Sequence, residues 1–239
     1  MLLSTPQQVD AAEDLKSILG GRIAGIFSDA TMHTPVSVTD RALAEVRKYE
    51  ADSCRLEAAA LSGSGKNPIS DLIAVEDIRA LASSLPDIVK GEEDGPAREL
   101  ALYGAWLCGV CLGSQSMSLH HNLCHVLGGT FDLPHAQTHT AVLPHAVAYN
   151  APVTKDTMKK LANVLPDSQG DAIQGLNKLL SQLKVKRALK EFGMKEEDIE
   201  RATEITLLRP YQNPRKLDRS LIHELIRRAW AGEPARADL

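Results

Sequence analysis

The sequence lacks several features that would place it in a specialised class of protein. It has no run of about 20 apolar residues, and no basic stretch precedes an apolar one, so it predicts neither a membrane-spanning helix nor a secretory leader. The formal net charge is −4 and the sequence pI is about 6.1. Nothing electrostatic therefore favours nucleic acid or a membrane surface as a partner. We expect a cytoplasmic protein that binds neither.

Cysteine is also scarce, with four residues in 239. Cys108 and Cys111 form a CxxC pair, but the surrounding run LYGAWLCGVCLG is apolar, whereas a redox pair needs a polar, activating environment. No second CxxC completes a zinc site, and the spacing indicates no disulfide framework. The pair is predicted to be small and buried.

What the sequence does have is a concentration of histidine between Ser118 and Asn150. Histidine has an unperturbed pKa near neutrality and serves as acid, base, metal ligand or hydrogen-bonding partner. The concentration indicates a site without saying of which kind. Six of the chain's eight histidines fall in this stretch: His120, His121, His125, His135, His139 and His145.

Helical spacing groups several of these histidines. The segment MSLHHNLCHVLG predicts a helix that ends at Gly128–Gly129. His121 and His125 are four residues apart and share a face of it, with Cβ atoms roughly 6 Å apart. His120 points about 100° away from that face. His135 follows a proline, which favours the start of a second helix there.

Any one of these histidines alone is best explained as a hydrogen-bonded core residue or a helix cap. Three of them together, in a HisxxxHis pair that meets a Pro-His corner, are harder to explain by packing. We therefore predict a catalytic set of His121, His125 and His135. The predicted substrate-binding set is His139, Tyr211 and Asn213. Helix capping and packing explain Tyr211 and Asn213 equally well.

Five stretches carry a resemblance to a known family: ALYGAWLCGVCLG (101–113), LHHNLCHVLGGTFDLPHAQTHT (119–140), VLPHAVAYNAP (142–152), PYQNPR (210–215) and RRAWAGEP (227–234). They closely resemble the iron-containing alcohol dehydrogenase and dehydroquinate synthase-like superfamily, in its maleylacetate reductase branch.

The resemblance implies roles for three histidines. In metal-dependent members, two ligand histidines are spaced as His121 and His135 are, and the histidine that matches His125 lies near the cofactor ring and substrate. Maleylacetate reductases are understood to work without metal and to reduce maleylacetate to 3-oxoadipate with NADH or NADPH.

The chain reads as two parts. Residues 1–60 alternate strand and helix, which is typical of a parallel sheet, and resemble a truncated nucleotide-binding domain. Residues 61–239 are predicted to be a helical domain that carries the histidine-rich site. The expected fold class is therefore a small parallel α/β remnant followed by an all-α helical bundle, mainly α overall.

The phosphate-binding Gly-Gly-Gly-Ser turn that the resemblance implies is absent after Cys54. SGSGK (62–66) does not replace it, because its glycine spacing does not match a Walker A turn. Hydride transfer requires a bound nicotinamide, so we expect the redox role to be lost. The predicted function is a cofactor-independent and metal-independent cyclisation, pericyclic reaction, isomerisation or dehydration of a small organic substrate, such as a secondary metabolite.

Three alternatives stay open. One is an NAD(P)H-dependent, maleylacetate reductase-like oxidoreductase. Another is a mononuclear metal enzyme in which Glu50, Asp52 or Cys54 completes a site with His121 and His135. The third is a non-catalytic remnant of a longer protein. In each case a truncated sheet leaves strand edges that proteins normally cover, so we expect a homodimer.

Overall fold

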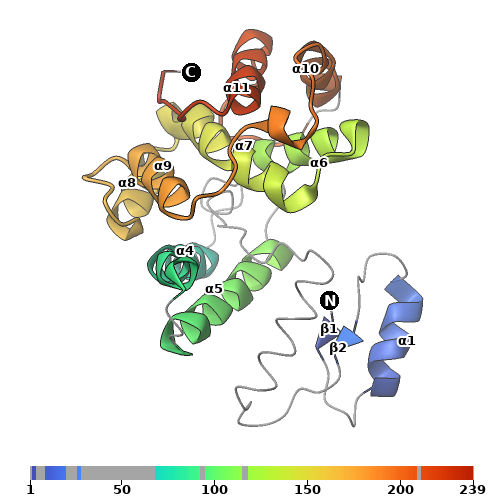
Figure 1. Ribbon diagram of the computed structural model, residues 1–239, viewed down its shortest axis with the longest axis vertical. Helices are drawn as coiled ribbons and strands as arrows, with labels where there is room; N and C mark the ends of the chain where they lie inside the picture. Colours follow the sequence, from blue (N-terminus) through green and yellow to red (C-terminus); the bar gives the residue numbers. More distant parts are fainter. Residues whose placement is uncertain are drawn as a thin grey trace. The chain divides into compact units, whose positions relative to one another are not determined.

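The structure, a computed structural model, describes residues 2–3, 9–19, 26–27, 68–91, 95–114, 118–208 and 211–238 (Figure 1). The chain divides into two compact units, Met1–Ser53 and Cys54–Leu239.

The first unit contains a helix and two very short strands. β1 (Leu2–Leu3) pairs in parallel with β2 (Ile26–Phe27), and α1 (Val9–Leu19) lies between them in the sequence. This order follows the sequence pattern, but strands of two residues do not establish the α/β segment predicted for residues 1–60. The sequence pattern TPVSVTDRALAEVRKYEA also predicts a helix over residues 34–51, and this stretch lies outside the described residues.

The described part of the second unit is mainly helical, and the predicted mainly helical fold is confirmed. None of the described helices combines the length and apolar character that crossing a bilayer requires. In chain order the helices are α4 (Pro68–Lys90), α5 (Gly95–Ser114), α6 (Leu119–Phe131), α7 (His135–Asn150), η3 (Ala151–Val153), α8 (Lys155–Val164), α9 (Ala172–Gln182), η4 (Leu189–Phe192), α10 (Asp198–Leu208) and α11 (Arg219–Ala231).

Aspartate side chains define two of the helix starts. The Asp171 carboxylate accepts hydrogen bonds from two backbone N–H groups in the first turn of α9, and Asp218 does the same for α11. Each such cap stabilises a helix by about 1 kcal/mol, because the first N–H groups have no partner within the helix. Gly232 follows the last residue of α11, and its φ of 77° is the left-handed conformation typical of a residue that closes a helix.

The corner between α6 and α7 differs from the sequence prediction in one respect. α6 continues through Gly128–Gly129 to Phe131, so the predicted end of the helix was wrong. The additional turn carries Phe131 onto the core, and this burial offsets the roughly 1 kcal/mol that each glycine costs a helix. Asp132, at φ 55°, makes the turn instead. The start of α7 at His135 is confirmed.

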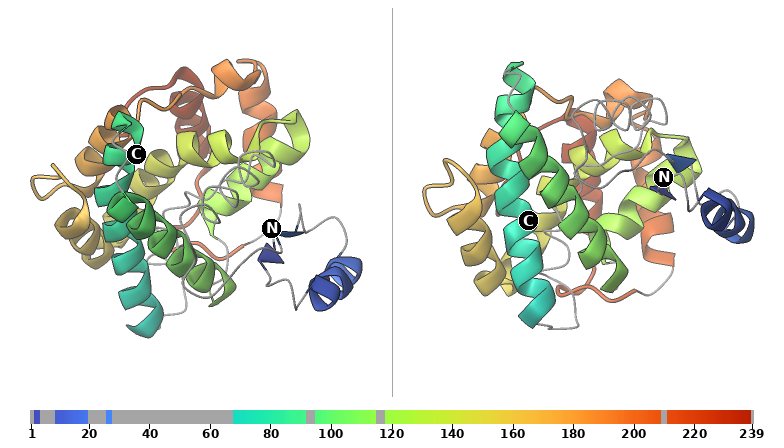
Figure 2. Two further views of the ribbon diagram at one scale, coloured as in Figure 1. Left: turned by 60° about the horizontal axis from the view of Figure 1, so that its bottom comes forward. Right: turned by 90° about the horizontal axis from the view of Figure 1, so that it is seen from below.

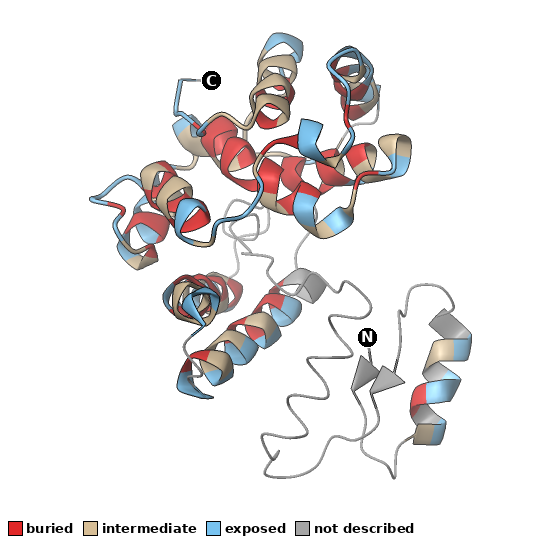
Figure 3. Ribbon diagram, viewed as in Figure 1, coloured by how far each residue is buried: buried red, intermediate tan, exposed pale blue. Residues whose placement is uncertain are grey.

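α7 is the helix around which the second unit is built. It contacts α6, α9 and α11, and most of its residues are buried, as the red ribbon of Figure 3 shows. Val142 and Tyr149 belong to a core cluster shared with α6, α10 and α11. Leu143 belongs to a second cluster, formed with α4, α5, α8 and α9. A helix that is buried on most sides lies in the interior of its domain.

α4 and α5 pack side by side at close range (Figure 2). Gly104 on α5 allows this approach, because a Cβ atom built there would lie 2.8 Å from Cγ of the buried Leu81. Cys108 and Cys111 follow on the same helix and are both buried, as predicted.

Replacing Gly104 with alanine is expected to destabilise the helical unit by about 1–3 kcal/mol, because the added methyl group forces strain on a close-packed core. Urea unfolding followed by far-UV circular dichroism measures the change. Gly109→Ala is the matched control on the same helix, because nothing lies within 4 Å of its added Cβ. The control should gain up to about 1 kcal/mol from helix propensity. Equal effects of the two substitutions would contradict the close approach of α4 and α5.

Candidate functional site

Histidine rings meet where α6 packs against α7. His135 and His139, one turn apart on α7, have ring centroids 4.4 Å apart, and the His139 ring lies 5.0 Å from that of His121 on α6. His125 lies 5.9 Å from His135 and 6.4 Å from His121. The structure therefore brings the three predicted catalytic residues together with His139, the first of the predicted substrate-binding residues.

Exposure divides this histidine cluster into an outer and an inner part. His125 and His135 are exposed, whereas His121 and His139 keep only 3% and 4% of their surface accessible. His135 is the first residue of α7, and the backbone N–H groups of a first helical turn favour a negatively charged neighbour. His125 and His135 therefore form the solvent-exposed part of the cluster, and the buried imidazoles form its inner part.

His120 joins the cluster although the sequence places it off the shared face of its neighbours on α6. Its ring lies 4.8 Å from that of His139 and 5.5 Å from that of His121. Its Nε2 atom lies 3.0 Å from the backbone carbonyl oxygen of His139. A carbonyl only accepts hydrogen bonds, so Nε2 donates and carries the proton. The spacing within one helix could not reveal this contact, because it arises from the packing of α7 across α6.

The remaining predicted substrate-binding residues belong to the segment before α11 and contact the α6–α7 pair. Asn213 is hydrogen-bonded to the backbone N–H of Leu119, where α6 starts, and to Asn150, where α7 ends. Tyr211 packs against the core that these helices share. Its hydroxyl is buried without a hydrogen-bond partner among the described residues, and burial, reinforced by the nearby Tyr149, raises the pKa of that hydroxyl.

The described residues do not fit an iron site. The group of potential ligands found among them is His120, Cys124 and His139, all buried, with donor atoms within 4.8 Å of one another. Two imidazoles and a thiol differ from the two-histidine, one-carboxylate set typical of non-haem iron. The group includes neither His121 nor His135, the ligand positions that the resemblance implies, and no carboxylate from the described part of the chain joins it.

Comparison with known proteins decides the family. Residues 58–230 match the model of the C-terminal domain of the Fe-containing alcohol dehydrogenase family. The chain belongs to the iron-containing alcohol dehydrogenase family. The match covers the described helices from α4 almost to the end of α11, including every histidine of the cluster, and the resemblance seen in the sequence is confirmed.

Individual relatives agree with this assignment. The maleylacetate reductase of Sphingobium indicum is 35% identical, and the alignment covers 98% of this chain and 90% of the relative. The crystal structure of maleylacetate reductase from Rhizobium sp. strain MTP-10005 is 32% identical with a TM-score of 0.71, covering 98% of this chain and 89% of that one. The alignment with the Sphingobium relative spans 317 residues, more than the 239 present here. An internal stretch of the relative therefore has no counterpart.

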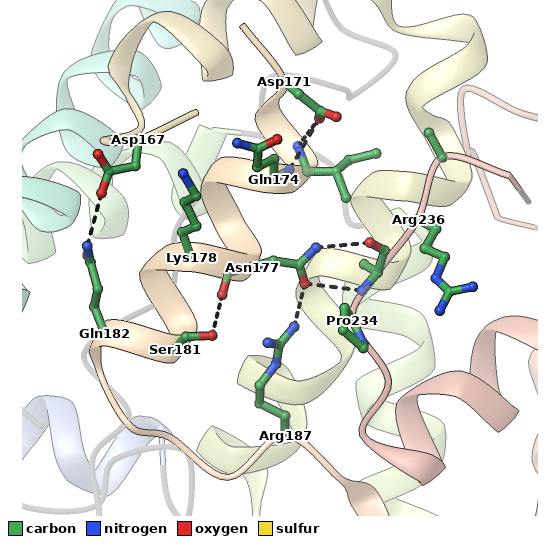
Figure 4. A pocket seen from close by; sticks show the side chains of 13 residues that line it. Asp167, Asp171, Gln174, Asn177, Lys178, Ser181, Gln182, Arg187, Pro234 and Arg236 are labelled. Carbon is green, nitrogen blue, oxygen red and sulfur yellow. Dashed lines mark hydrogen bonds between the residues drawn. The ribbon is translucent and has the colours of Figure 1, made fainter. Parts of the chain in front are cut away.

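A groove of about 790 Å³ lies between α9 and the C-terminal segment 234–237 (Figure 4). Asn177, on its wall, holds that segment: its Nδ2 donates to the carbonyl of Ala235 at 2.9 Å, and its Oδ1 accepts from the N–H of the same residue at 3.1 Å. Arg187 donates to the same Oδ1 atom. None of the predicted site residues lines this groove.

The sixth histidine of the stretch, His145, is 1% exposed on α7. Burial, reinforced by the positive charges of Arg187 and Arg228, lowers its pKa to about 4, and Glu233 opposes this only in part. His145 is therefore neutral in the folded protein at neutral pH.

Stability should fall as the pH is lowered from about 6.5 to about 4. In this range an unfolded chain protonates His145 and the folded chain does not, so the unfolded state binds more protons and the free energy of unfolding decreases, by about 3 kcal/mol at the lower end. Urea unfolding at several pH values measures the slope. His145→Gln should show a shallower slope than the wild type. Identical slopes would contradict the buried, neutral imidazole.

Proposed function

We propose that this chain is an enzyme that converts a small organic substrate without a net change in oxidation state, by cyclisation, isomerisation or dehydration. The observation that supports this is the series of ring contacts from the exposed His125 and His135 to the buried His139 and His121. Such a series allows one imidazole to hold the substrate while another moves a proton to or from it. Family membership is compatible with this, because one fold supports different reactions.

In this proposal each histidine of the cluster has its own role. The ring centroids of His125 and His135 are 5.9 Å apart and both side chains are exposed, so we place the substrate oxygen between them. In this arrangement His135 holds the oxygen from the α7 side. His125 and His121, on one face of α6, act as the general acid and base. His139 lies between His135 and His121 and links the outer and inner parts of the cluster.

A second candidate is an NAD(P)H-dependent reduction. Relatives with 35% and 32% identity to this chain are named maleylacetate reductases. Bound NADH or NADPH would supply the hydride, and the histidine cluster would hold a small oxo acid against the nicotinamide. The sequence contains no Gly-Gly-Gly-Ser turn, so nucleotide would have to bind elsewhere in the chain or through a partner.

Calorimetric titration with NADH and with NADPH separates these candidates. The non-redox proposal expects no saturable binding of either nucleotide at micromolar concentration, because the phosphate-binding turn is missing. The same preparation is then incubated with a panel of small unsaturated oxo acids, and product formation is followed by proton NMR. Micromolar binding would contradict the non-redox proposal in favour of the reductase. No binding and no turnover would indicate a non-catalytic remnant.

Single alanine substitutions test the roles of the histidines. His125→Ala and His121→Ala should each lower kcat by roughly 10²- to 10⁴-fold, because a positioned acid or base contributes a factor of that order. His135→Ala should mainly raise KM, since this residue holds the substrate. Product formation by NMR measures all three. His223→Ala is the control, because His223 lies on α11 beside Glu200. Activity that survives two of the three cluster substitutions would instead indicate catalysis by confinement.

A further inference from the structure

We propose that Asn150 and Asn213 are positioning residues: their side-chain amides join the end of α7 to the start of α6 and thereby set the spacing of the histidine rings between the two helices. The consequence for turnover rests on the proposed function, whereas the placement itself is a property of the fold. Asn213 then acts through the histidines and not, as the sequence predicts, on the substrate directly.

The two amides are hydrogen-bonded in both directions. Asn213 Nδ2 donates to Asn150 Oδ1 at 2.8 Å, and Asn150 Nδ2 donates to Asn213 Oδ1 at 3.2 Å. Asn150 is the last residue of α7 and is 5% exposed. A reciprocal pair requires both amides to keep one mutual orientation. The burial of Asn150 makes a broken bond costly, because water does not readily reach it to replace the lost partner.

Asn213 also closes the first turn of α6. Its Oδ1 accepts a hydrogen bond at 3.3 Å from the backbone N–H of Leu119, the first residue of that helix. Ser118 occupies the N-cap position but its side chain makes no capping bond. The cap is thus supplied from a distant part of the chain, next to the position where His120 and His121 begin the cluster.

The hydrogen-bonding capacity of Asn213 is filled by these contacts. Its Oδ1 accepts two bonds, from Leu119 and Asn150, and its Nδ2 donates two, to Asn150 and to the carbonyl of Arg215. A carboxamide offers two acceptor sites and two donor hydrogens, so a substrate could bind to this side chain only by displacing a bond within the protein. The contacts therefore favour positioning over substrate binding.

The segment that carries Asn213 is itself held firmly against α7. The Arg215 guanidinium donates to the carbonyl of Tyr149 at 2.8 Å and lies 4.7 Å from the centre of the Tyr149 ring. The Tyr149 hydroxyl donates to the carbonyl of Lys216 at 2.8 Å and accepts from the N–H of Asp218 at 3.0 Å. These bonds place Asn213 where its amide can reach both helices.

The α6–α7 pair is thus fixed at both ends. The covalent corner over residues 132–134 joins the end of α6 to the start of α7, and the amide pair joins the start of α6 to the end of α7. The histidine cluster lies between these two fixed points. If the amide pair is lost, α6 can shift or rotate against α7 about the corner, and ring distances of 4.4–6.4 Å cannot be kept.

Histidine modification by diethyl pyrocarbonate tests this placement without requiring turnover. In the wild type, His125 and His135 should react, and the buried His120, His121 and His139 should be protected. In Asn213→Ala the three buried imidazoles should react roughly tenfold faster, because local opening of the helix pair exposes them. Peptide mass spectrometry assigns each modified residue. Asn150→Asp, which keeps the acceptor for Asn213 Nδ2, should give an intermediate rate, and it supplies the measurement if Asn213→Ala does not fold.

Asn177→Ala is the matched control, because Asn177 also bonds in two directions, but to the C-terminal segment of the same unit (Figure 4). It should lower thermal stability and leave the protection of the three histidines unchanged. Two results would overturn the proposal: unchanged protection in both Asn213→Ala and Asn150→Asp, or an equal rise in reactivity in Asn177→Ala.

Activity provides an independent readout. With a substrate in hand, Asn213→Ala should lower kcat by roughly 10- to 100-fold, because displacement of catalytic groups by about 1 Å has effects of that size. KM should change much less. Altered protection without any detectable turnover would leave the placement intact and contradict only the proposed function. Unchanged protection with normal turnover in wild type and variant would overturn the positioning role alone.

Discussion

The burial of α7 is the constraint on which the rest of this structure depends. α7 contributes to two core clusters and carries polar groups into the interior, where each unpaired group costs about 1–3 kcal/mol. Thr138 avoids this cost within its own helix, because its hydroxyl donates a hydrogen bond to the carbonyl of Pro134 at 2.7 Å. Tyr149 and Asn150 instead form hydrogen bonds with the segment before α11. The polar contacts that order the histidine cluster are therefore also those that allow α7 to be buried.

Periodicity and turn chemistry predict part of this architecture. Apolar residues at helical spacing predict the helices from α4 onward, and the proline before His135 predicts the start of α7. The same reasoning failed at Gly128–Gly129, because local propensity there is outweighed by the packing of Phe131. The geometry of a single helix places His121 and His125 on one face, but it places His120 on another face. The structure nevertheless brings His120 into the cluster.

The contacts that sequence reasoning missed share one property: they join residues far apart in the chain. Asn150 and Asn213 are separated by 63 positions, and Leu119 and Asn213 by 94. No local pattern marks an asparagine as one half of such a pair. Asn213 lies in the PYQNPR stretch (210–215) that resembles the family, and its hydrogen bonds to both helices give a physical reason for an asparagine at this position.

The double attachment of α6 to α7 makes this helix pair a closed ring of covalent and hydrogen bonds. A ring of this kind restricts the relative motion of its members before any ligand arrives, so folding has already met the entropic cost of ordering the imidazoles. Binding then needs little reorganisation, and most of its free energy remains available to constrain the substrate. Preorganisation of this kind would hold an acid and a base at fixed positions beside a bound molecule before any proton moves.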